Sequence, residues 1–335
     1  MKNILIIMPK FYSYQSQMKA DLESRGAYVK FYDEEPEKSK FLILKNIEKI
    51  FRIKNIFVGF NKKLAQRIIA EQPAGGYDEL LVIRGNVLTA DTIKNIKEKA
   101  LKPGARTVYY AWDSFENMRH KGELGRVFDY RATFDSVDAK NDPDYELLPL
   151  FYSDDFDAEK LQQPSEYKYD YVSVSAFFPF RYKYFKAFKE ANPDKKLCLK
   201  IYMAPSVYRG KKLTDPKLVK ELDMDIVSFK PFSPTEIRDM VLQSRAVLDL
   251  AHEQQQGLTM RTMETLGIKR KLITNNCHLK EYEFYHENND YIWDGKDFVL
   301  PGKEWLDKPY AEDDNIRKKY SIHAWLSKLL DEPSR

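Results

Sequence analysis

Short, almost purely apolar runs recur along this chain, and each is followed by a segment with helical spacing. A run such as Asn3–Met8 has no polar face, so it fits a strand that helices cover on both sides. In the first half we expect strands at Asn3–Met8, Tyr28–Tyr32, Glu79–Arg84, Thr107–Ala111, Val127–Thr133 and Glu146–Leu148. We expect helices at Ser16–Arg25, in two pieces within residues 38–72 that break near Lys54–Gly59, and at Thr89–Leu101. Such alternation with short connections predicts a parallel, doubly wound sheet.

A second series of the same kind follows the polar, acidic segment Ser153–Ser165, whose composition is typical of a linker. We expect strands at Tyr169–Ser175, Leu197–Ile201, Ile226–Phe229, Ala246–Leu250 and Lys271–Thr274. We expect helices at Arg181–Ala191, Asp215–Glu221, Ser233–Gln243 and Thr259–Leu266, and a helical tail at Asp313–Leu330. The two series together predict two doubly wound α/β domains facing across a cleft, with ligands at the carboxyl ends of the strands.

Composition narrows the class of protein. A chain of 335 residues is long enough for two domains, and 43% hydrophobic residues suffice for two cores. The net charge of +4 is too small to indicate nucleic acid binding. Cys198 and Cys277 lack metal spacing and are expected as reduced thiols, and the five histidines form no zinc motif. The first apolar run is too short for a signal peptide or a membrane span, so we expect a cytoplasmic protein with any membrane contact peripheral.

The most specific stretch of the chain, residues 254–276, reads QQQGLTMRTMETLGIKRKLITNN. A glycine-marked turn at Gly257–Thr259 leads into a short helix, whose N-terminal N–H groups and positive end suit an anion. Arg261 could bind a phosphate bidentately, and Glu264, one turn later on the same face, could accept hydrogen bonds from a ribose. The alternative is that Thr259 is an ordinary helix cap and that Arg261 and Glu264 are solvated surface charges.

This stretch resembles the donor-binding region of GT-B glycosyltransferases, especially small bacterial enzymes of capsular and lipopolysaccharide assembly. The residues that carry the resemblance are Gln255, Gly257, Leu258, Thr259, Arg261 and Glu264, followed by Lys271, Leu272, Ile273, Thr274 and Asn276. A looser likeness continues through most of residues 165–300. The resemblance implies a Rossmann-like acceptor-side domain at residues 1–155, a nucleotide-sugar-binding domain at residues 165–312, and a C-terminal helix at residues 313–335 that crosses back to the first domain.

Further candidate site residues follow other predicted strands. Asp113 follows Thr107–Ala111 and could be the general base for an acceptor hydroxyl, or Asp113 and Ser114 could cap the next turn. Arg84, Gly85 and Asn86 also end a strand and could contact a substrate or form a turn.

In the second half, the loop at Ser173–Arg181 resembles a phosphate-facing loop of GT-B enzymes, so Arg181 could neutralise the leaving diphosphate or be a surface arginine. Lys200 could also neutralise the leaving diphosphate. The resemblance implies that the Phe229–Pro231 backbone, which includes Lys230, holds the base of the nucleotide. His252 could contact the donor sugar, although a single loop histidine is more often structural.

No metal ion or other cofactor is expected. The pairs Asp154–Asp155 and Asp223 with Asp225 lack a metal-binding context and are interpreted as solvated acids, and cations with helix N-termini can stabilise a leaving diphosphate. The sequence therefore predicts a metal-independent glycosyltransferase. It would move a sugar from a nucleotide-sugar donor to a surface glycan or a lipid-linked glycan. Two alternatives stay open: a nucleotide-sugar epimerase of the same architecture, and a non-catalytic two-domain sugar-binding protein.

Overall fold

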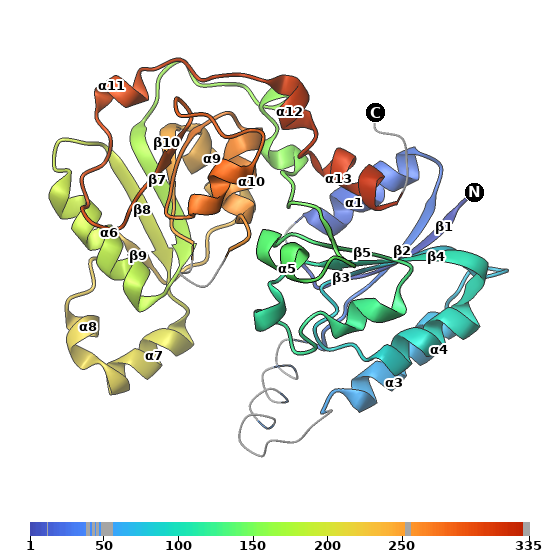
Figure 1. Ribbon diagram of the computed structural model, residues 1–335. Coiled ribbons are helices and arrows are strands. Elements are labelled where there is room, and N and C mark those ends of the chain that lie inside the picture. The colour runs from blue at the N-terminus through green and yellow to red at the C-terminus, as the bar shows by residue number, and fades with distance from the viewer. Residues whose placement is uncertain are drawn as a thin grey trace. The chain divides into compact units, whose positions relative to one another are not determined.

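The computed structural model describes residues 1–11, 13–37, 41, 44, 47, 56–251 and 256–330. Within them the chain forms two compact units. The first consists of Met1–Leu150 and the residues from His323 onward, and the second of Phe151–Ile322. Each unit has a parallel six-stranded sheet with helices packed against it (Figure 1). The prediction of two doubly wound, Rossmann-like α/β units is confirmed.

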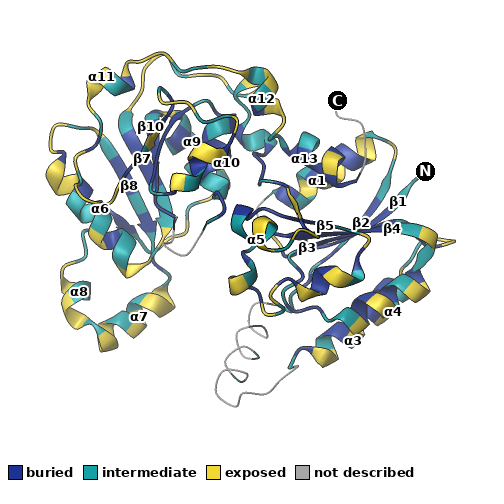
Figure 2. Ribbon diagram, in the orientation of Figure 1, coloured by how far each residue is buried: buried dark blue, intermediate teal, exposed yellow. Residues whose placement is uncertain are grey.

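The first sheet has the strand order β2-β1-β3-β4-β5-β6. Its strands are β1 (Asn3–Ile7), β2 (Tyr28–Tyr32), β3 (Tyr77–Ile83), β4 (Leu101–Ala111), β5 (Tyr130–Thr133) and β6 (Glu146–Leu147). The helices of this unit are α1 (Tyr14–Ser24), α3 (Val58–Ala70), α4 (Ala90–Ala100), α5 (Ser136–Asn141) and α13 (Ile322–Leu329). Figure 2 shows the strands largely buried, whereas α3 and α4 each have an exposed side.

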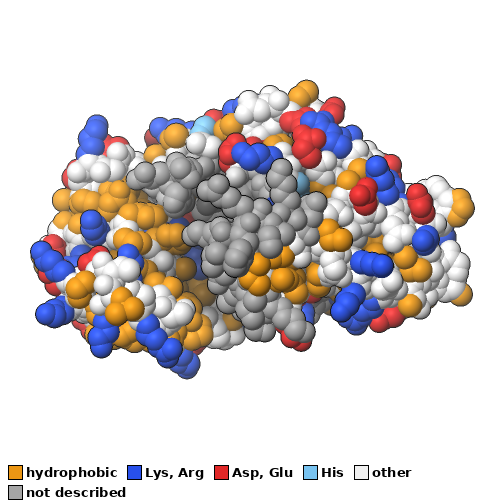
Figure 3. All heavy atoms as spheres, turned by 90° about the horizontal axis from the view of Figure 1, so that it is seen from below, with side chains coloured by type: hydrophobic (Ala, Val, Ile, Leu, Met, Phe, Trp, Pro, Cys, Tyr) orange, Lys and Arg blue, Asp and Glu red, His pale blue; other side chains and the backbone are white. Residues whose placement is uncertain are grey.

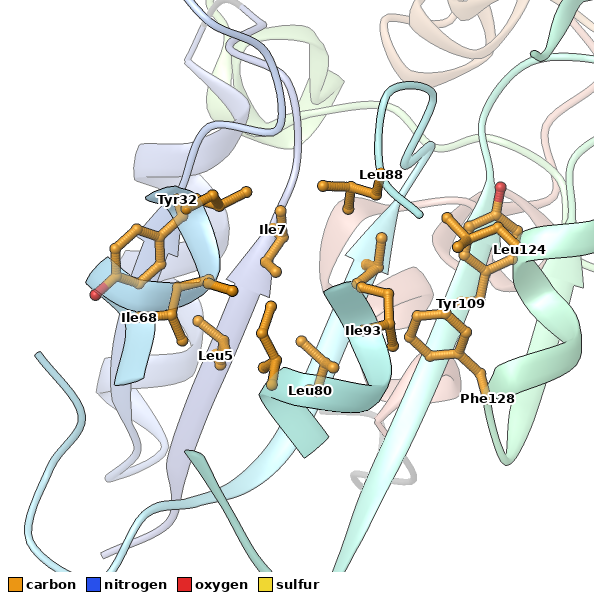
Figure 4. Packing of buried hydrophobic residues seen from close by; sticks show 14 of the residues in the cluster. Leu5, Ile7, Tyr32, Ile68, Leu80, Leu88, Ile93, Tyr109, Leu124 and Phe128 are labelled. Atoms are coloured by element: carbon orange, nitrogen blue, oxygen red, sulfur yellow. The ribbon is translucent and has the colours of Figure 1, made fainter. Parts of the chain in front are cut away.

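Side chains of the central strands alternate between the two faces of this sheet. Leu5, Leu80 and Tyr109 lie on one face and pack with Ile68 of α3 and Ile93 of α4 in one buried cluster (Figure 4). Burial of each side chain of this size contributes roughly 1.5–3 kcal/mol. Both faces of the strands are covered, which is why the apolar runs show no polar alternation.

Helix α13 lies at the end of the sequence but belongs to the first unit. The ring of Trp325 meets the Tyr110 ring edge-on, with their centroids 4.9 Å apart. Nη1 of Arg25 donates to Oγ of Ser327 at 2.9 Å, and Nη1 of Arg106 donates to the carbonyl oxygen of Leu329 at 2.6 Å. The helix therefore completes the core on the face of the sheet opposite α3 and α4 (Figure 1).

The second sheet has the strand order β12-β11-β10-β7-β8-β9. Its strands are β7 (Tyr169–Ala176), β8 (Leu197–Tyr202), β9 (Val227–Ser228), β10 (Ser244–Asp249), β11 (Lys271–Thr274) and β12 (Asp290–Ile292). The helices of this unit are α6 (Pro179–Ala191), α7 (Pro205–Thr214), α8 (Pro216–Lys220), α9 (Pro234–Leu242), α10 (Met260–Gly267), α11 (Lys303–Leu306) and α12 (Asp314–Lys318).

Several boundaries differ from the sequence prediction. Helix α7 and strand β12 were not expected, and β4 begins at Leu101 instead of Thr107. The expected tail helix is divided into α12 and α13, because Tyr320 and Ile322 exchange backbone hydrogen bonds with Tyr152 at 2.8 and 2.9 Å. The expected helix break at Lys54–Gly59 lies partly outside the described residues, and α3 begins at Val58.

The segment expected to be a linker is packed into the second unit. Its residues form two short 3-10 turns, at Asp154–Phe156 and Ala158–Lys160. Nη1 of Arg317 lies 2.9 Å from Oδ1 of Asp157, and Nη2 lies 2.9 Å from Oε1 of Glu159. Arg317 is only 3% exposed. The acidic composition of this segment thus serves a buried arginine as well as solubility.

Gly267 offers a direct test of this packing. A methyl group there would lie 2.5 Å from both the carbonyl oxygen of Phe156 and Cγ of Tyr152. We expect Gly267→Ala to lower the free energy of unfolding by about 1–3 kcal/mol, because the backbone of residue 156 must move. Gly210→Ala in α7 is the matched control. No atom lies within 4 Å of its added methyl group, so it should be neutral or stabilising by up to about 1 kcal/mol. Urea unfolding measures the free energy of unfolding of both variants. An equal change in the two would contradict the packing argument.

Candidate functional site

Two threonine hydroxyls tie the N-terminus of α10 to the end of β10. Thr259 caps α10 by accepting a hydrogen bond from the N–H of Thr262 at 3.1 Å. Both hydroxyls donate to Oδ2 of Asp249, the last residue of β10, and the bond from Thr262 measures 3.0 Å. Asp249 is 8% exposed, so these donors satisfy a buried carboxylate. The helix end is therefore fixed at the carboxyl edge of the sheet.

Two asparagines after β11 hold the loop that precedes α10. Asn275 accepts from the N–H of Ala251 at 2.8 Å and donates to its carbonyl oxygen at 3.1 Å. Nδ2 of Asn276 donates to the carbonyl oxygens of Gln256, at 3.0 Å, and Gly257, at 3.3 Å. Leu258 is buried at 2% exposure. The described ends of this loop are thus held by side-chain hydrogen bonds, and Asn276, which belongs to the sequence pattern, makes two of them.

The loops after β7 and β10 meet at the switch point of the second sheet. From β7 the chain builds outward through β8 and β9 on one side and through β10, β11 and β12 on the other. Doubly wound sheets bind their ligands where the strand order reverses in this way. The segment singled out in the sequence therefore lies at the expected place in the fold.

Arg181, on the first turn of α6, reaches the same place from the loop after β7. Its Nε donates to the carbonyl oxygen of Leu250 at 3.1 Å. Its guanidinium lies 5.0 Å from the ring centroid of Phe178. Burial lowers the pKa of Arg181, and the nearby Asp249 carboxylate opposes this effect. The structure thus holds Arg181 against the segment that follows β10, and its role at an anion site stays a prediction.

Arg261 and Glu264 form an ion pair within α10. Nη1 of Arg261 lies 2.7 Å from Oε2 of Glu264, and their side chains are only 17% and 10% exposed. The interpretation as solvated surface charges is therefore wrong for both residues. A phosphate that binds Arg261 would compete with Glu264 for the same guanidinium nitrogen.

Lys230 and Lys200 lie farther along the sheet. Lys230 is exposed and follows β9, three strands from β10. Its N–H donates to Oγ of Ser228 at 3.2 Å, and the same hydroxyl donates to its carbonyl oxygen at 2.8 Å. Nζ of Lys200 donates to the carbonyl oxygen of Asp225 at 2.7 Å. His252 lies outside the described residues. The roles suggested for these residues stay predictions.

In the first unit, the Arg84 side chain contacts three acidic side chains at the carboxyl edge of the sheet. Its Nε donates to Oδ2 of Asp113 at 2.9 Å, and its Nη1 donates to Oε1 of Glu35 at 2.8 Å and of Glu34 at 3.3 Å. Burial would lower the pKa of Arg84, but the attraction of the three carboxylates outweighs it and raises that pKa. We call these residues, Arg84, Glu34, Glu35 and Asp113, the acidic cluster.

Asp113 is the most accessible carboxylate of the acidic cluster, with its side chain 44% exposed, whereas that of Glu34 is fully buried. Among the described residues no backbone N–H donates to Asp113, and the hydroxyl of Ser114 donates instead to Oδ2 of Asp135. The alternative that Asp113 and Ser114 cap the next turn is therefore not what this geometry shows. Asp113 keeps an exposed carboxylate with a fixed orientation.

The backbone at Arg84 adopts a left-handed conformation, with φ of 69°, and Gly85 follows with φ of 64°. The phenol of Tyr109 donates to the carbonyl oxygen of Arg84 at 2.7 Å. A side chain at Gly85 would collide with Cδ2 of Leu124 at 2.6 Å. Strained backbone of this kind is retained where the surroundings hold it, often at functional sites.

Sequence reasoning missed Glu34 and Glu35. The signal was present, because three acidic residues, Asp33, Glu34 and Glu35, directly follow the strand Tyr28–Tyr32. Their partner Arg84 lies 50 and 49 residues away in sequence, so no local pattern joins them. Only the sheet brings the three together, because β2 and β3 lie on the two sides of β1 and end at the same edge.

The acidic pairs that resemble metal ligands have cationic partners. Nζ of Lys189 lies 2.7 Å from Asp223 and 3.1 Å from Asp225, and Lys160 lies 2.7 Å from Asp154. In the part of the chain that the structure describes, no group of three or more histidine, cysteine or acidic side chains is arranged to hold a metal ion. No helix among the described residues has the length and hydropathy to cross a membrane.

No protein-family model matches the chain, and no curated protein sequence matches it. Solved structures do share its fold. The UDP-GlcNAc 2-epimerase of Methanocaldococcus jannaschii, in complex with UDP-GlcNAc and UDP, is 10% identical with a TM-score of 0.54 over 99% of this chain and 100% of that chain. A glycosyltransferase involved in avilamycin A biosynthesis is 10% identical with a TM-score of 0.56, over 99% and 97%. A glycosyltransferase from Rickettsia africae is 11% identical with a TM-score of 0.54, over 98% and 97%. The fold is therefore that of GT-B glycosyltransferases and these epimerases.

The acidic cluster predicts a pH effect on stability. Burial raises the pKa of Glu34 well above its ordinary value of 4.5, and Arg84 opposes this only in part. Above about pH 4.5 the folded state therefore keeps a proton that the unfolded state has lost, so the free energy of unfolding falls as pH rises through this window. Glu34→Gln cannot lose a proton and should lack this fall.

Urea unfolding at several pH values above about 4.5 measures the difference. The stability of Glu34→Gln relative to wild type should increase with pH, whereas Glu116→Gln, at a carboxylate 85% exposed, should track wild type. A Glu34→Gln difference that does not change with pH would contradict the buried, proton-retaining carboxyl group.

Proposed function

We propose that this protein is a glycosyltransferase that moves a sugar from a nucleotide-sugar donor to a surface glycan, of the capsule or lipopolysaccharide type, or to a lipid-linked glycan. The observation that carries the proposal is the site at the switch point of the second sheet. There the N-terminus of α10, the half-buried Arg181 and the Arg261–Glu264 pair belong to elements at the carboxyl edge of the same sheet. The solved structures of the same fold, which include enzymes that use nucleotide-sugars, support it.

The donor diphosphate would bind to the helix end. The N-terminus of α10 carries partial positive charge, and Arg181 and Arg261 add two full charges next to it. Charges in a partly buried site act more strongly than in water, so they stabilise the negative charge that develops on the leaving diphosphate. No metal ion is needed in this scheme, and none is proposed.

Glu264 would accept hydrogen bonds from the ribose, and the backbone at Lys230 would hold the base. The ribose fits Glu264 because a carboxylate accepts two hydroxyl donors side by side. Gly257, Leu258 and Thr259 would shape the loop, and the bonds to Asn276 and Asp249 keep that shape before the donor arrives. A preformed site loses little entropy on binding.

Asp113 would take the proton from the acceptor hydroxyl. Its carboxylate is partly exposed, as a base that meets substrate must be, and Arg84 fixes its orientation. The buried Glu34 and the flanking Glu35 share the same guanidinium. In this assignment Arg84 is a positioning residue and Asp113 is the catalytic residue.

A nucleotide-sugar epimerase is the second candidate, and the acidic cluster favours it. Epimerisation needs groups that remove and return a proton at one carbon atom, and three carboxylates around one arginine could supply them. Incubation with a nucleotide-sugar in the absence of acceptor separates the two reactions. Formation of an epimer of the donor would reject the glycosyltransferase, whereas transfer of the sugar to an added glycan would support it.

The donor site is tested by calorimetry with UDP in the presence of EDTA. We expect wild type to bind UDP without metal, and Glu264→Gln to bind more weakly by about 1–3 kcal/mol, because a charge-assisted acceptor for the ribose is lost. Glu190→Gln is the matched control, since this carboxylate is exposed on α6. Unchanged affinity in a folded Glu264→Gln variant would remove Glu264 from the site. Binding that requires added magnesium or manganese would reject the metal-free diphosphate grip.

The base is tested by Asp113→Asn, which keeps the shape and the acceptor oxygen for Arg84 but cannot take a proton. We expect UDP affinity equal to wild type and a loss of roughly 10²–10⁴-fold in turnover, the usual range for removing a general base. The turnover is measured as the rate of sugar transfer at a saturating concentration of donor. Turnover near the wild-type value would exclude Asp113 as the base and favour a retaining mechanism or another carboxylate, such as Glu116.

A further inference from the structure

Helices α7 and α8 carry a local excess of positive charge. Residues 205–220 contain five cations, Arg209, Lys211, Lys212, Lys217 and Lys220, and one carboxylate, Asp215. The segment thus has a net charge of +4, which equals the formal net charge of the whole chain, +4. The charges of the remaining residues sum to zero, although single segments among them are also basic or acidic.

These cations point to solvent and lack internal partners. All but Lys211 are exposed, and none of the five forms an ion pair with a described residue. The single carboxylate, Asp215, caps α8 by accepting from the N–H of Leu218 at 3.2 Å. Fixed charges that no internal acid neutralises are available to an external anionic partner.

Apolar side chains stand among the cations. Leu213 is 86% exposed and Val207 is 40% exposed, both on α7. Tyr208, on the inner side of α7, packs against Phe229 with ring centroids 4.9 Å apart. The helix is thus anchored from within while it presents leucine and valine outward. Figure 3, seen from below, shows hydrophobic and basic side chains mixed over the end of the second unit that carries these helices.

We propose that the surface formed by Arg209, Lys211, Lys212, Leu213, Lys217 and Lys220 docks the protein on an anionic lipid bilayer. Lysines over a charged interface combined with an outward leucine are the elements of interfacial membrane binding. Double-stranded DNA would be attracted by the same charges, but it offers nothing to an exposed leucine. The surface is separate from the donor site, because it lies on the helices after β8 and not on the loops after β7 and β10.

The size of the effect can be estimated from the charges. Each Lys or Arg close to an anionic membrane contributes about 1 kcal/mol, and the attraction is screened over about 10 Å at about 0.1 M salt. Removal of three cations should therefore reduce the partition coefficient by about a hundredfold. Added salt should release the wild-type protein.

The experiment is co-sedimentation of the full chain with vesicles of phosphatidylcholine alone or mixed with phosphatidylglycerol. We expect wild type to bind the anionic vesicles and not the neutral ones. The variant Arg209→Gln, Lys212→Gln, Lys217→Gln should lose about a hundredfold in partition coefficient. Leu213→Gln, which changes no charge, should lose several-fold.

The control changes the same number of charges elsewhere: Lys62→Gln, Lys63→Gln, Lys94→Gln, three exposed lysines of α3 and α4. It should bind vesicles as wild type does. An equal loss in the control, an unaffected Leu213→Gln, or tighter binding of a DNA duplex than of the vesicles at the same salt would each overturn the proposal. Each variant must first give the circular dichroism spectrum of the wild-type fold. Because vesicle binding needs neither donor nor turnover, its outcome is independent of the proposed glycosyltransfer.

Discussion

All strands within the two sheets pair in parallel, and this constraint decides where chemistry can gather. Parallel strands bring their carboxyl ends to one edge of the sheet. Where the strand order reverses, the loops that follow two adjacent strands run to opposite sides and leave a crevice between them. In the second sheet these loops carry Arg181 and the N-terminus of α10. In the first sheet, the reversal lies between β1 and β3, and Arg84 directly follows β3. Residues distant in sequence thus meet at each edge without any dedicated binding domain.

The two edges have opposite electrical character. At the edge of the second sheet, two arginines and a helix N-terminus surround Asp249 and Glu264, and both carboxylates are already engaged in hydrogen bonds or ion pairs. At the edge of the first sheet, Arg84 is shared by the Glu35 and Asp113 carboxylates and by Glu34, whose pKa burial raises well above its ordinary value. The first arrangement attracts an anion and the second repels one. This difference in charge is the physical basis on which we propose phosphate binding for the second unit and proton transfer for the first.

The sequence was sufficient where a local pattern encodes the structure. Apolar runs such as Asn3–Ile7 can be predicted as buried strands from their composition alone. The Thr259 cap can be predicted from the residues around it. It was insufficient where pairing is long-range or the signal is short. No local pattern joins Glu34 to Arg84, and β12 is only three residues long. In α7, Gly210 between Arg209 and Lys211 interrupts the apolar spacing of the helix. Residues 153–165 were predicted to be a linker from their acidic composition. Their packing could not be predicted, because the buried partner, Arg317, lies far along the chain.

The position of α13 determines the order in which the chain can fold during synthesis. The residues that complete the core of the first unit, among them Trp325, leave the ribosome after every residue of the second unit. The second unit can therefore fold while the first still exposes the sheet face against which Trp325 will pack. Domains that complete early fold as units during translation, whereas an unfinished core exposes apolar surface that favours aggregation. For this protein the vulnerable interval lasts until α13 has been synthesised, and it concerns the unit that was synthesised first.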